Sequence, residues 1–160
     1  MALRKPLVIV GGQVQQIQVG DTLDAIVAEI EVLTQTNGEA APIAIGAPVY
    51  SSAADTVKKA QANASGTVEI VGLVKSTSIS ASAAGSIQTS GVLAATTAQW
   101  DAVAGTTGGL TAGTVYYLDP ATAGKITSNA PYTAGQYVVR IGKAISTTEL
   151  LIDIDAPILL

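Results

Sequence analysis

Short apolar segments, separated by glycine, proline, serine and threonine, follow one another from Tyr50 to the end of the chain. Short segments bounded by turn-forming residues are typical of strands in all-β domains. We therefore predict a mainly β fold, a small antiparallel barrel or sandwich. The predicted strands cover residues 67–75, 86–93, 114–118, 124–127, 136–145 and 148–154.

The last two segments show the clearest alternation of apolar and polar positions, and the link between them is short enough for a hairpin. One face of each segment is therefore predicted to be buried. One face of the first segment carries Tyr137, Val139, Ile141 and Ile145, and in the second segment Leu150, Ile152 and Ile154 alternate with Glu149, Leu151 and Asp153.

The region before residue 67 allows alternatives. Residues 22–33 fit both a helix and a strand, and we favour a strand for the second half because Asn37-Gly38 follows it. Asn-Gly readily forms the tight turn of a hairpin. Pro42 and Pro48 limit the run between them to a short or edge strand. Residues 51–66 fit either a helical turn or the second limb of a hairpin that starts before Tyr50.

The first residues predict an arm. Leu7–Val10 is an apolar run that ends at Gly11-Gly12, and the positions after it keep no single alternation. Such a segment becomes ordered by lying along a neighbouring protein, although packing of these runs as core strands is the alternative. We assign residues 1–34 to an extended N-terminal arm with the ambiguous segment, and residues 35–160 to the β domain.

Composition argues against an enzyme. The chain has no histidine and no cysteine, which removes the commonest general base, the commonest metal ligand and the thiolate nucleophile. No Gly-x-Ser-x-Gly turn, Ser-x-x-Lys frame or phosphate-binding glycine loop occurs. We expect no catalytic residue and no cofactor.

Charge and hydropathy bear on the partners. The net charge of −4 argues against nucleic acid, and no apolar run is long enough for a signal peptide or a membrane span. Only 12% of the residues are charged, against about a quarter in ordinary soluble domains. A weakly charged surface built from small side chains favours packing against other protein.

A few polar or aromatic residues are candidates for metal binding, sugar binding or acid and base chemistry. Asp153 and Asp155 share a strand face, but without a third ligand nearby a solvated edge is favoured over a calcium site. Trp100 is interpreted as a core or interface anchor rather than a sugar platform. Paired carboxylates can act as general acid and base in a glycosidase, but such an enzyme also needs a cleft lined with aromatic residues, and this chain has few of them. The acidic residues concerned are Asp21, Asp24, Glu29 and Glu31.

The stretch GGLTAGTVYYLDPATAGKIT, residues 108–127, predicts a hairpin. Gly109 and Gly113 permit a tight turn that leads into a strand, Asp119-Pro120 begins the next turn, and Gly124 begins the return strand. The tyrosines between these turns would place one face inward and offer the other to a neighbour.

This stretch, together with the run from Pro48 to Leu93, GQYVVRIGKAISTTELLIDI and the opening RKPLVIVGGQVQQIQVGDTLDA, resembles the small β domains of virion proteins of tailed bacteriophages. The family includes head decoration or cement proteins, head fibres and tail-fibre segments. The resemblance implies a structural protein on the outer capsid surface, made in the host cytoplasm, that stabilises the capsid. The implied partners are the major capsid protein and further copies of the chain, as a trimer.

Two further functions stay open beside this one. A head-fibre or tail-fibre attachment component is the nearest alternative. A carbohydrate-binding β module is the alternative of another class, with Trp100, Tyr116 and Tyr132 as the stacking residues. For the virion role, the partner-binding residues are predicted to be Arg4, Lys5, Leu7, Ile9, Val14, Ile17, Trp100 and Tyr116.

Overall fold

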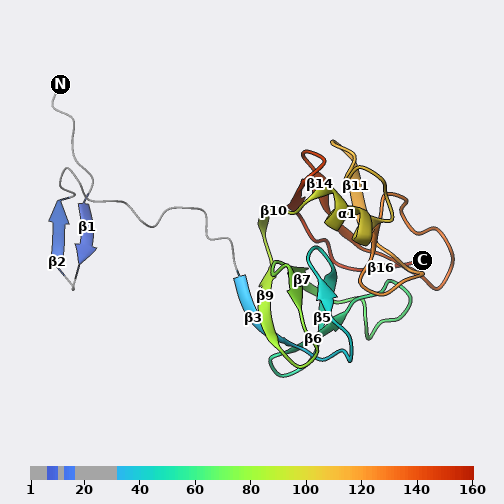
Figure 1. Cartoon of the computed structure of the whole chain (residues 1–160), viewed down its shortest axis with the longest axis horizontal. Helices are drawn as coiled ribbons and strands as arrows, with labels where there is room; N and C mark the ends of the chain where they lie inside the picture. The colour runs from blue at the N-terminus through green and yellow to red at the C-terminus, as the bar shows by residue number, and fades with distance from the viewer. Residues whose placement is uncertain (1–6, 11–12, 17–31) are drawn as a thin grey trace.

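The computed structural model describes residues 7–10, 13–16 and 32–160, and it confirms the mainly β fold (Figure 1). The strands before the helix are β1 (Leu7–Val10), β2 (Gln13–Gln16), β3 (Val32–Asn37), β4 (Ile43–Ala44), β5 (Pro48–Ala53), β6 (Thr56–Lys59), β7 (Ile70–Val74), β8 (Ser78–Ile79), β9 (Ala84–Gln88) and β10 (Gly91–Ala94). The helix α1 (Thr97–Ala104) follows, and then β11 (Val115–Leu118), β12 (Ile126–Thr127), β13 (Tyr137–Val138), β14 (Arg140–Ala144), β15 (Glu149–Ile152) and β16 (Ile158–Leu159).

Five strands close a barrel in the order β3-β6-β5-β7-β9. All of its pairings are antiparallel except that of β3 with β6, which is parallel. The barrel core is aliphatic and includes Val49, Val57 and Ile87. The short pair β4 and β8 adds Ile43 and Ile79, which lie directly opposite each other and are both buried.

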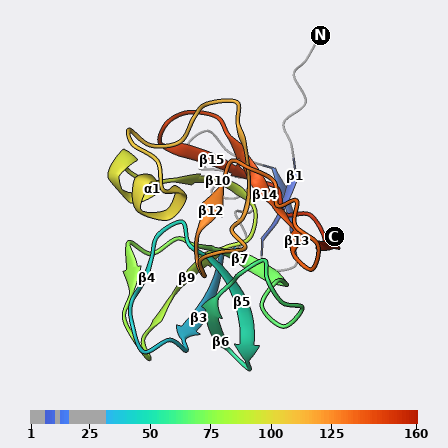
Figure 2. The same cartoon turned by 90° about the vertical axis from the view of Figure 1, so that its right-hand side faces the viewer.

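The second half of the chain forms a five-stranded sheet in the order β10-β15-β14-β11-β12. Figure 2 shows this sheet and α1 above the barrel. Two residues, Thr89 and Ser90, connect barrel strand β9 to sheet strand β10. A shared core joins the two parts, because Ala60 and Leu73 from the barrel side pack in one cluster with Leu118 and Leu150 of the sheet.

Helix α1 places the single tryptophan in that shared core. Thr96 begins the helix with a reciprocal capping box to Gln99, and Gly105 ends it in the left-handed conformation. The Trp100 side chain is completely buried, and its indole Nε1 donates to the Thr148 carbonyl oxygen at 3.0 Å. Of the two interpretations of Trp100, core or interface anchor, the structure supports the core.

Most of the strand predictions are confirmed. The segment at 51–66 forms the second limb of a hairpin, β5–β6, and β14 and β15 pair as the predicted hairpin. The 108–127 stretch forms the β11–β12 hairpin, with positive φ at Gly109 and Gly113. The predicted strand 86–93 is in fact two strands, β9 and β10, because the chain passes from barrel to sheet between them. The predicted strand 136–145 is also two strands, since β13 pairs with β16 while β14 pairs with β11 and β15.

The hairpin predicted at Asn37-Gly38 is wrong, since β3 pairs with β6 and β9 and not with the strand that follows it. Asn37 is buried and organises the backbone around it instead of occupying a hairpin turn. Its Nδ2 donates to the carbonyl oxygens of Ile79 and Ala41 at 2.8 and 3.0 Å, and its Oδ1 accepts from the Glu39 N–H. A buried carboxamide satisfied in this way fixes the exit from β3.

The N-terminal segment contains local pairing that the arm prediction did not include. β1 and β2 pair antiparallel over four residues and form a sheet of their own in the described part of the chain. β3 begins at Val32, within the range assigned to the arm, so the predicted boundary at 34/35 falls inside a barrel strand. The helix-or-strand alternative for 22–33 lies outside the described residues up to position 31.

A carboxylate holds the loop that leads from α1 to β11. Asp101 Oδ1 accepts from the Gly109 N–H at 2.7 Å and from the Thr106 hydroxyl, and Oδ2 accepts from the Gly108 N–H. The Gly109 hydrogen bond is the main cause that lowers the pKa of Asp101; removal from water opposes it, and the Thr106 and Gly108 bonds reinforce it. All three donors favour the ionised form.

We predict that this carboxylate makes part of the stability acid-sensitive. Because the pKa in the folded state is lowered, the contribution is complete above the unfolded-state value of about 4 and is lost as the pH falls through the folded-state pKa. Denaturant titrations should show Asp101→Asn to be less stable than wild type at neutral pH, with a difference that shrinks toward pH ~2. A difference independent of pH would contradict this role.

Candidate functional site

The structure buries the two aromatic residues that were predicted to bind a partner. Trp100 and Tyr116 lie in the shared core, and the Tyr116 hydroxyl accepts from the Thr111 N–H at 3.0 Å. Neither ring has surface to offer to a partner or a sugar in this fold, so the assignment of these two residues to contact is corrected. Sequence periodicity could not separate a buried aromatic from an interface aromatic.

The other predicted contact residues belong to the N-terminal segment. Leu7 and Ile9 lie in β1 and Val14 lies in β2, where the structure describes the backbone pairing. Arg4, Lys5 and Ile17 lie outside the described residues, as do the acids at 21, 24, 29 and 31. Their role as contacts remains a prediction.

The described part of the chain presents a different candidate surface, the outer face of the five-stranded sheet. A row of side chains crosses this face through directly paired positions: Val92 lies opposite Leu151, Leu151 opposite Lys143, and Lys143 opposite Val115. Val92 and Leu151 are exposed, Lys143 is exposed and Val115 is half-buried. The edge of the sheet formed by β10 and β15 therefore carries an apolar pair on its solvent side, and Lys143 lies beside it on the central strand β14. We call these four residues the outer row.

Apolar and charged groups flank the outer row. The next row toward the β14–β15 turn contains the exposed Ile145, whose N–H donates to the carbonyl oxygen of Glu149. On the opposite side Arg140 forms an ion pair with Asp153, with Nη2 and Oδ2 at 2.8 Å. Charged groups thus lie beside and within a small apolar patch, a mixture found at many protein contacts.

A β-bulge explains why Ile145 lies on this face, although the alternation predicted that it shares a face with Ile141. The register of β11 with β14 shifts so that Tyr116 lies opposite Gly142 and Tyr117 opposite Arg140, which leaves Ile141 without a paired position. Ile141 and Ala144 are both buried, and Ile145 is exposed. One extra residue in a strand reverses the faces of the positions beyond it.

Sequence reasoning missed the outer row, although one signal was present. The alternation places Leu151 on one face with Glu149 and Asp153, and in the structure Leu151 is exposed while Leu150 and Ile152 on either side of it are buried. A large aliphatic residue at an outward strand position is that signal. The exposure of Val92 could not be predicted in the same way, since the predicted bounds of its strand were wrong.

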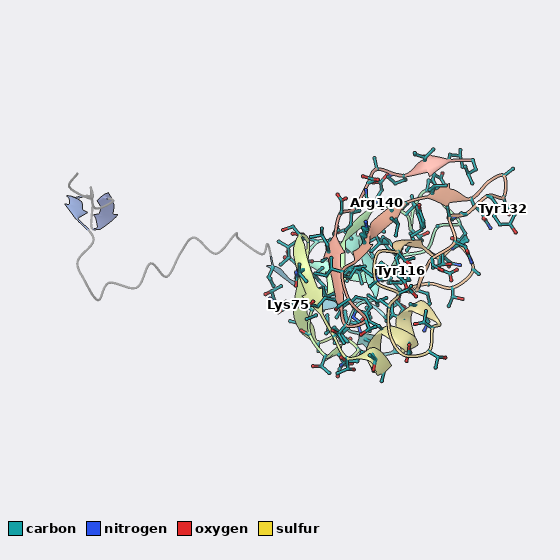
Figure 3. All side chains as sticks on the ribbon, turned by 90° about the horizontal axis from the view of Figure 1, so that it is seen from above. Lys75, Tyr116, Tyr132 and Arg140 are labelled. Carbon is teal, nitrogen blue, oxygen red and sulfur yellow. The ribbon has the colours of Figure 1, made fainter. Side chains whose placement is uncertain are left out.

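A second feature is a groove beside the loop that joins β12 to β13. The exposed Tyr132 forms part of its lining, with Asp119, Thr127, Asn129 and Gln136 among the polar residues. Figure 3 shows Tyr132 projecting at the end of the domain far from Lys75. Of the three aromatic residues considered for sugar stacking, Tyr132 is the one with an accessible ring.

Cation-binding and membrane features can be assessed for the described residues. No three acidic, histidine or cysteine side chains gather there as ligands of a metal ion. Asp153, considered with Asp155 as a calcium site, is instead paired with Arg140. Within the same residues no helix has the length and apolar character to cross a bilayer.

Comparison with known proteins adds no identity. The chain matches no protein-family model, and no curated protein matches it.

Proposed function

We propose that this chain is a structural virion protein, a capsid decoration or cement protein that binds the outer head surface of a tailed bacteriophage and stabilises the shell. The observation that carries the proposal is the outer row, with an exposed apolar pair on the solvent side of a sheet whose inner face already packs against the core. The contact is with the major capsid protein, and the protein acts as a homo-oligomer, a trimer.

The physical case for contact rests on the removal of apolar surface from water. Val92 and Leu151 are 38% and 42% exposed and pair directly across two strands, so both are dehydrated together when a partner covers the face. Burial of apolar area contributes about 25 cal/mol per Å². Only 12% of the residues are charged, so few charged groups would have to be dehydrated when a partner covers this surface.

The N-terminal segment supplies a second, extended contact in this proposal. It joins the body at Val32, the first residue of barrel strand β3. Arg4 and Lys5 are the first charged residues of the chain, and no acidic residue precedes Asp21. A basic, apolar segment of this kind fits along an acidic or apolar neighbour.

We predict that Leu151→Lys weakens binding to heads at least tenfold, equivalent to about 1.4 kcal/mol or more. The new ammonium group would lie at the middle of the dehydrated face and directly opposite Lys143, so burial and like-charge repulsion both oppose contact. The measurement is a titration of heads assembled by the source virus without this protein, with bound protein counted against the major capsid protein.

Leu33→Lys is the matched control. Leu33 is 43% exposed and Leu151 is 42% exposed, but Leu33 lies on barrel strand β3. The control should bind like wild type, and equal losses in both variants would show that overall charge, not the outer row, decides binding. Wild-type binding by Leu151→Lys would contradict the proposed surface. Saturation near the copy number of the capsid protein separates decoration from the fibre alternative, for which few copies would bind.

A further inference from the structure

The groove beside Tyr132 combines an exposed aromatic ring with free hydrogen-bonding groups. It has a volume of about 260 Å³, and its polar lining consists of Asp119, Thr127, Asn129, Tyr132, Thr133 and Gln136. This is close to the lower end of the size range of small-molecule sites, about 300 Å³. The space suits one small ring rather than an extended ligand.

Tyr132 is the most exposed large apolar side chain of the described residues, with 89% of its surface in contact with solvent. The residue before it, Pro131, is buried, so the loop is anchored immediately beside the ring. A phenol ring held outside the core presents a flat apolar face with a polar tip, which is the character that makes tyrosine common at binding surfaces. The C–H face of a pyranose ring is a matching surface.

The groups around the ring can bind hydroxyls. Asn129 donates its backbone N–H to Thr127 Oγ1, and the Gln136 backbone N–H and C=O are bonded to Thr133 and Leu160. Their side-chain carboxamides have no hydrogen-bond partner within the described chain, so each offers two N–H donors and one acceptor. A carboxamide donates and accepts hydrogen bonds from one planar group, so it can bond two adjacent hydroxyls of a sugar.

The charge of the groove selects the class of ligand. Asp119 is the acidic residue of the lining, and no lysine or arginine lines the groove. Asp119 Oδ1 accepts from the N–H groups of Ala121 and Thr122, while its second oxygen has no donor among the described residues. A carboxylate without a balancing cation disfavours phosphate, sulfate and sialic acid.

One side of the groove, residues 135–137, is held by backbone hydrogen bonds. The Gly135 N–H donates to the Leu160 carbonyl oxygen, the Leu160 N–H donates to the Gln136 carbonyl oxygen, and the Tyr137 N–H donates to the Ala62 carbonyl oxygen. These bonds tie the loop to the C-terminal strand β16 and to the barrel side of the domain. A site that is already ordered loses less entropy when it binds a ligand.

We propose that this groove binds a neutral saccharide, with the pyranose ring stacked on Tyr132 and two hydroxyls bonded by the carboxamides of Asn129 and Gln136. The inference goes beyond the virion role and does not depend on it, because the groove and the outer row involve different residues. Single-ring contacts bind weakly, and many copies on one surface would raise the avidity.

The test is an NMR titration of the ¹⁵N-labelled full-length protein with methyl α-D-mannopyranoside, methyl β-D-galactopyranoside and methyl α-D-glucopyranoside, with sialyllactose as the anionic probe. At least one neutral probe should shift the backbone signals of residues 127–136. Tyr132→Ala should weaken that binding at least tenfold, and Tyr132→Phe, which keeps the ring, should stay within about threefold of wild type. Asn129→Ala and Gln136→Ala should each weaken it several-fold.

Three outcomes would overturn the proposal: no neutral probe shifts these signals, sialyllactose binds best, or Tyr132→Ala binds as wild type does. The two proposals can fail separately. Leu151→Lys should bind the neutral probe normally, and Tyr132→Ala should bind heads normally, since each change lies outside the other surface.

Discussion

Replacement of Trp100 by alanine is expected to lower the free energy of unfolding by about 3–5 kcal/mol, the usual cost of removing a large buried aromatic side chain. Trp100 is completely buried and lies in the cluster shared by barrel and sheet, so its loss opens a cavity between the two parts. It also leaves the Thr148 carbonyl oxygen without its indole donor. Against a typical total of about 5–15 kcal/mol, this is a large fraction of the stability.

The measurement is denaturant unfolding followed by far-ultraviolet circular dichroism, because the variant has no tryptophan left to report by fluorescence. Trp100→Phe separates the two causes, since it keeps an aromatic ring in the core and removes only the hydrogen bond and part of the volume. It should cost about 1–2 kcal/mol. A loss below about 1 kcal/mol for Trp100→Ala would show that the barrel and the sheet do not depend on a common core.

The second large effect is expected at Gly109, which has a φ of +90°. A Cβ atom at this position would overlap the Thr147 carbonyl oxygen. That oxygen accepts from the Leu110 N–H, and the Gly109 N–H donates to Asp101, so the loop cannot move away without losing hydrogen bonds. Gly109→Ala should therefore combine backbone strain of about 1–2 kcal/mol with an overpacking cost of about 1–3 kcal/mol.

Gly113 is the matched control for the second prediction. Its φ is +81°, but a Cβ atom there would meet nothing within 4 Å. Gly113→Ala should cost only the strain of about 1–2 kcal/mol, and Gly113→Val should cost more because valine resists positive φ strongly. The difference in stability between Gly109→Ala and Gly113→Ala, measured by thermal unfolding, gives the cost of the overlap with the Thr147 carbonyl oxygen. Equal losses would mean that the loop yields at Gly109.

The fold class followed from the sequence because turn residues and short apolar runs are local signals. The β11–β12 and β14–β15 hairpins were predicted for that reason, and the β5–β6 hairpin was one of the two interpretations of residues 51–66. What failed depends on distant contacts: Asn37 is held by Ile79, more than forty positions away, and the split of 86–93 depends on where the barrel ends. The closing pair β3–β6 is parallel and was not expected.

The same distinction applies to the surfaces. Leu151 could be assigned to the outer face from alternation, but Ile145 could not, since the bulge at Ile141 appears only when β11 and β14 pair. Tyr132 was one of three aromatic alternatives, and burial of Trp100 and Tyr116 was needed to separate it from them. Sequence patterns give positions on a strand, and tertiary packing decides which positions face water.

The position of β3 in the barrel has a mechanical consequence. β3 is hydrogen-bonded on both sides, to β9 through five paired positions and to β6 through two, and the N-terminal segment enters the barrel at its first residue. Ladder hydrogen bonds lie across the strand direction, so a pull along β3 loads the bonds on both sides together rather than one after another. A body tethered through its N-terminal segment would thus receive tension in shear, the direction in which a sheet resists rupture best.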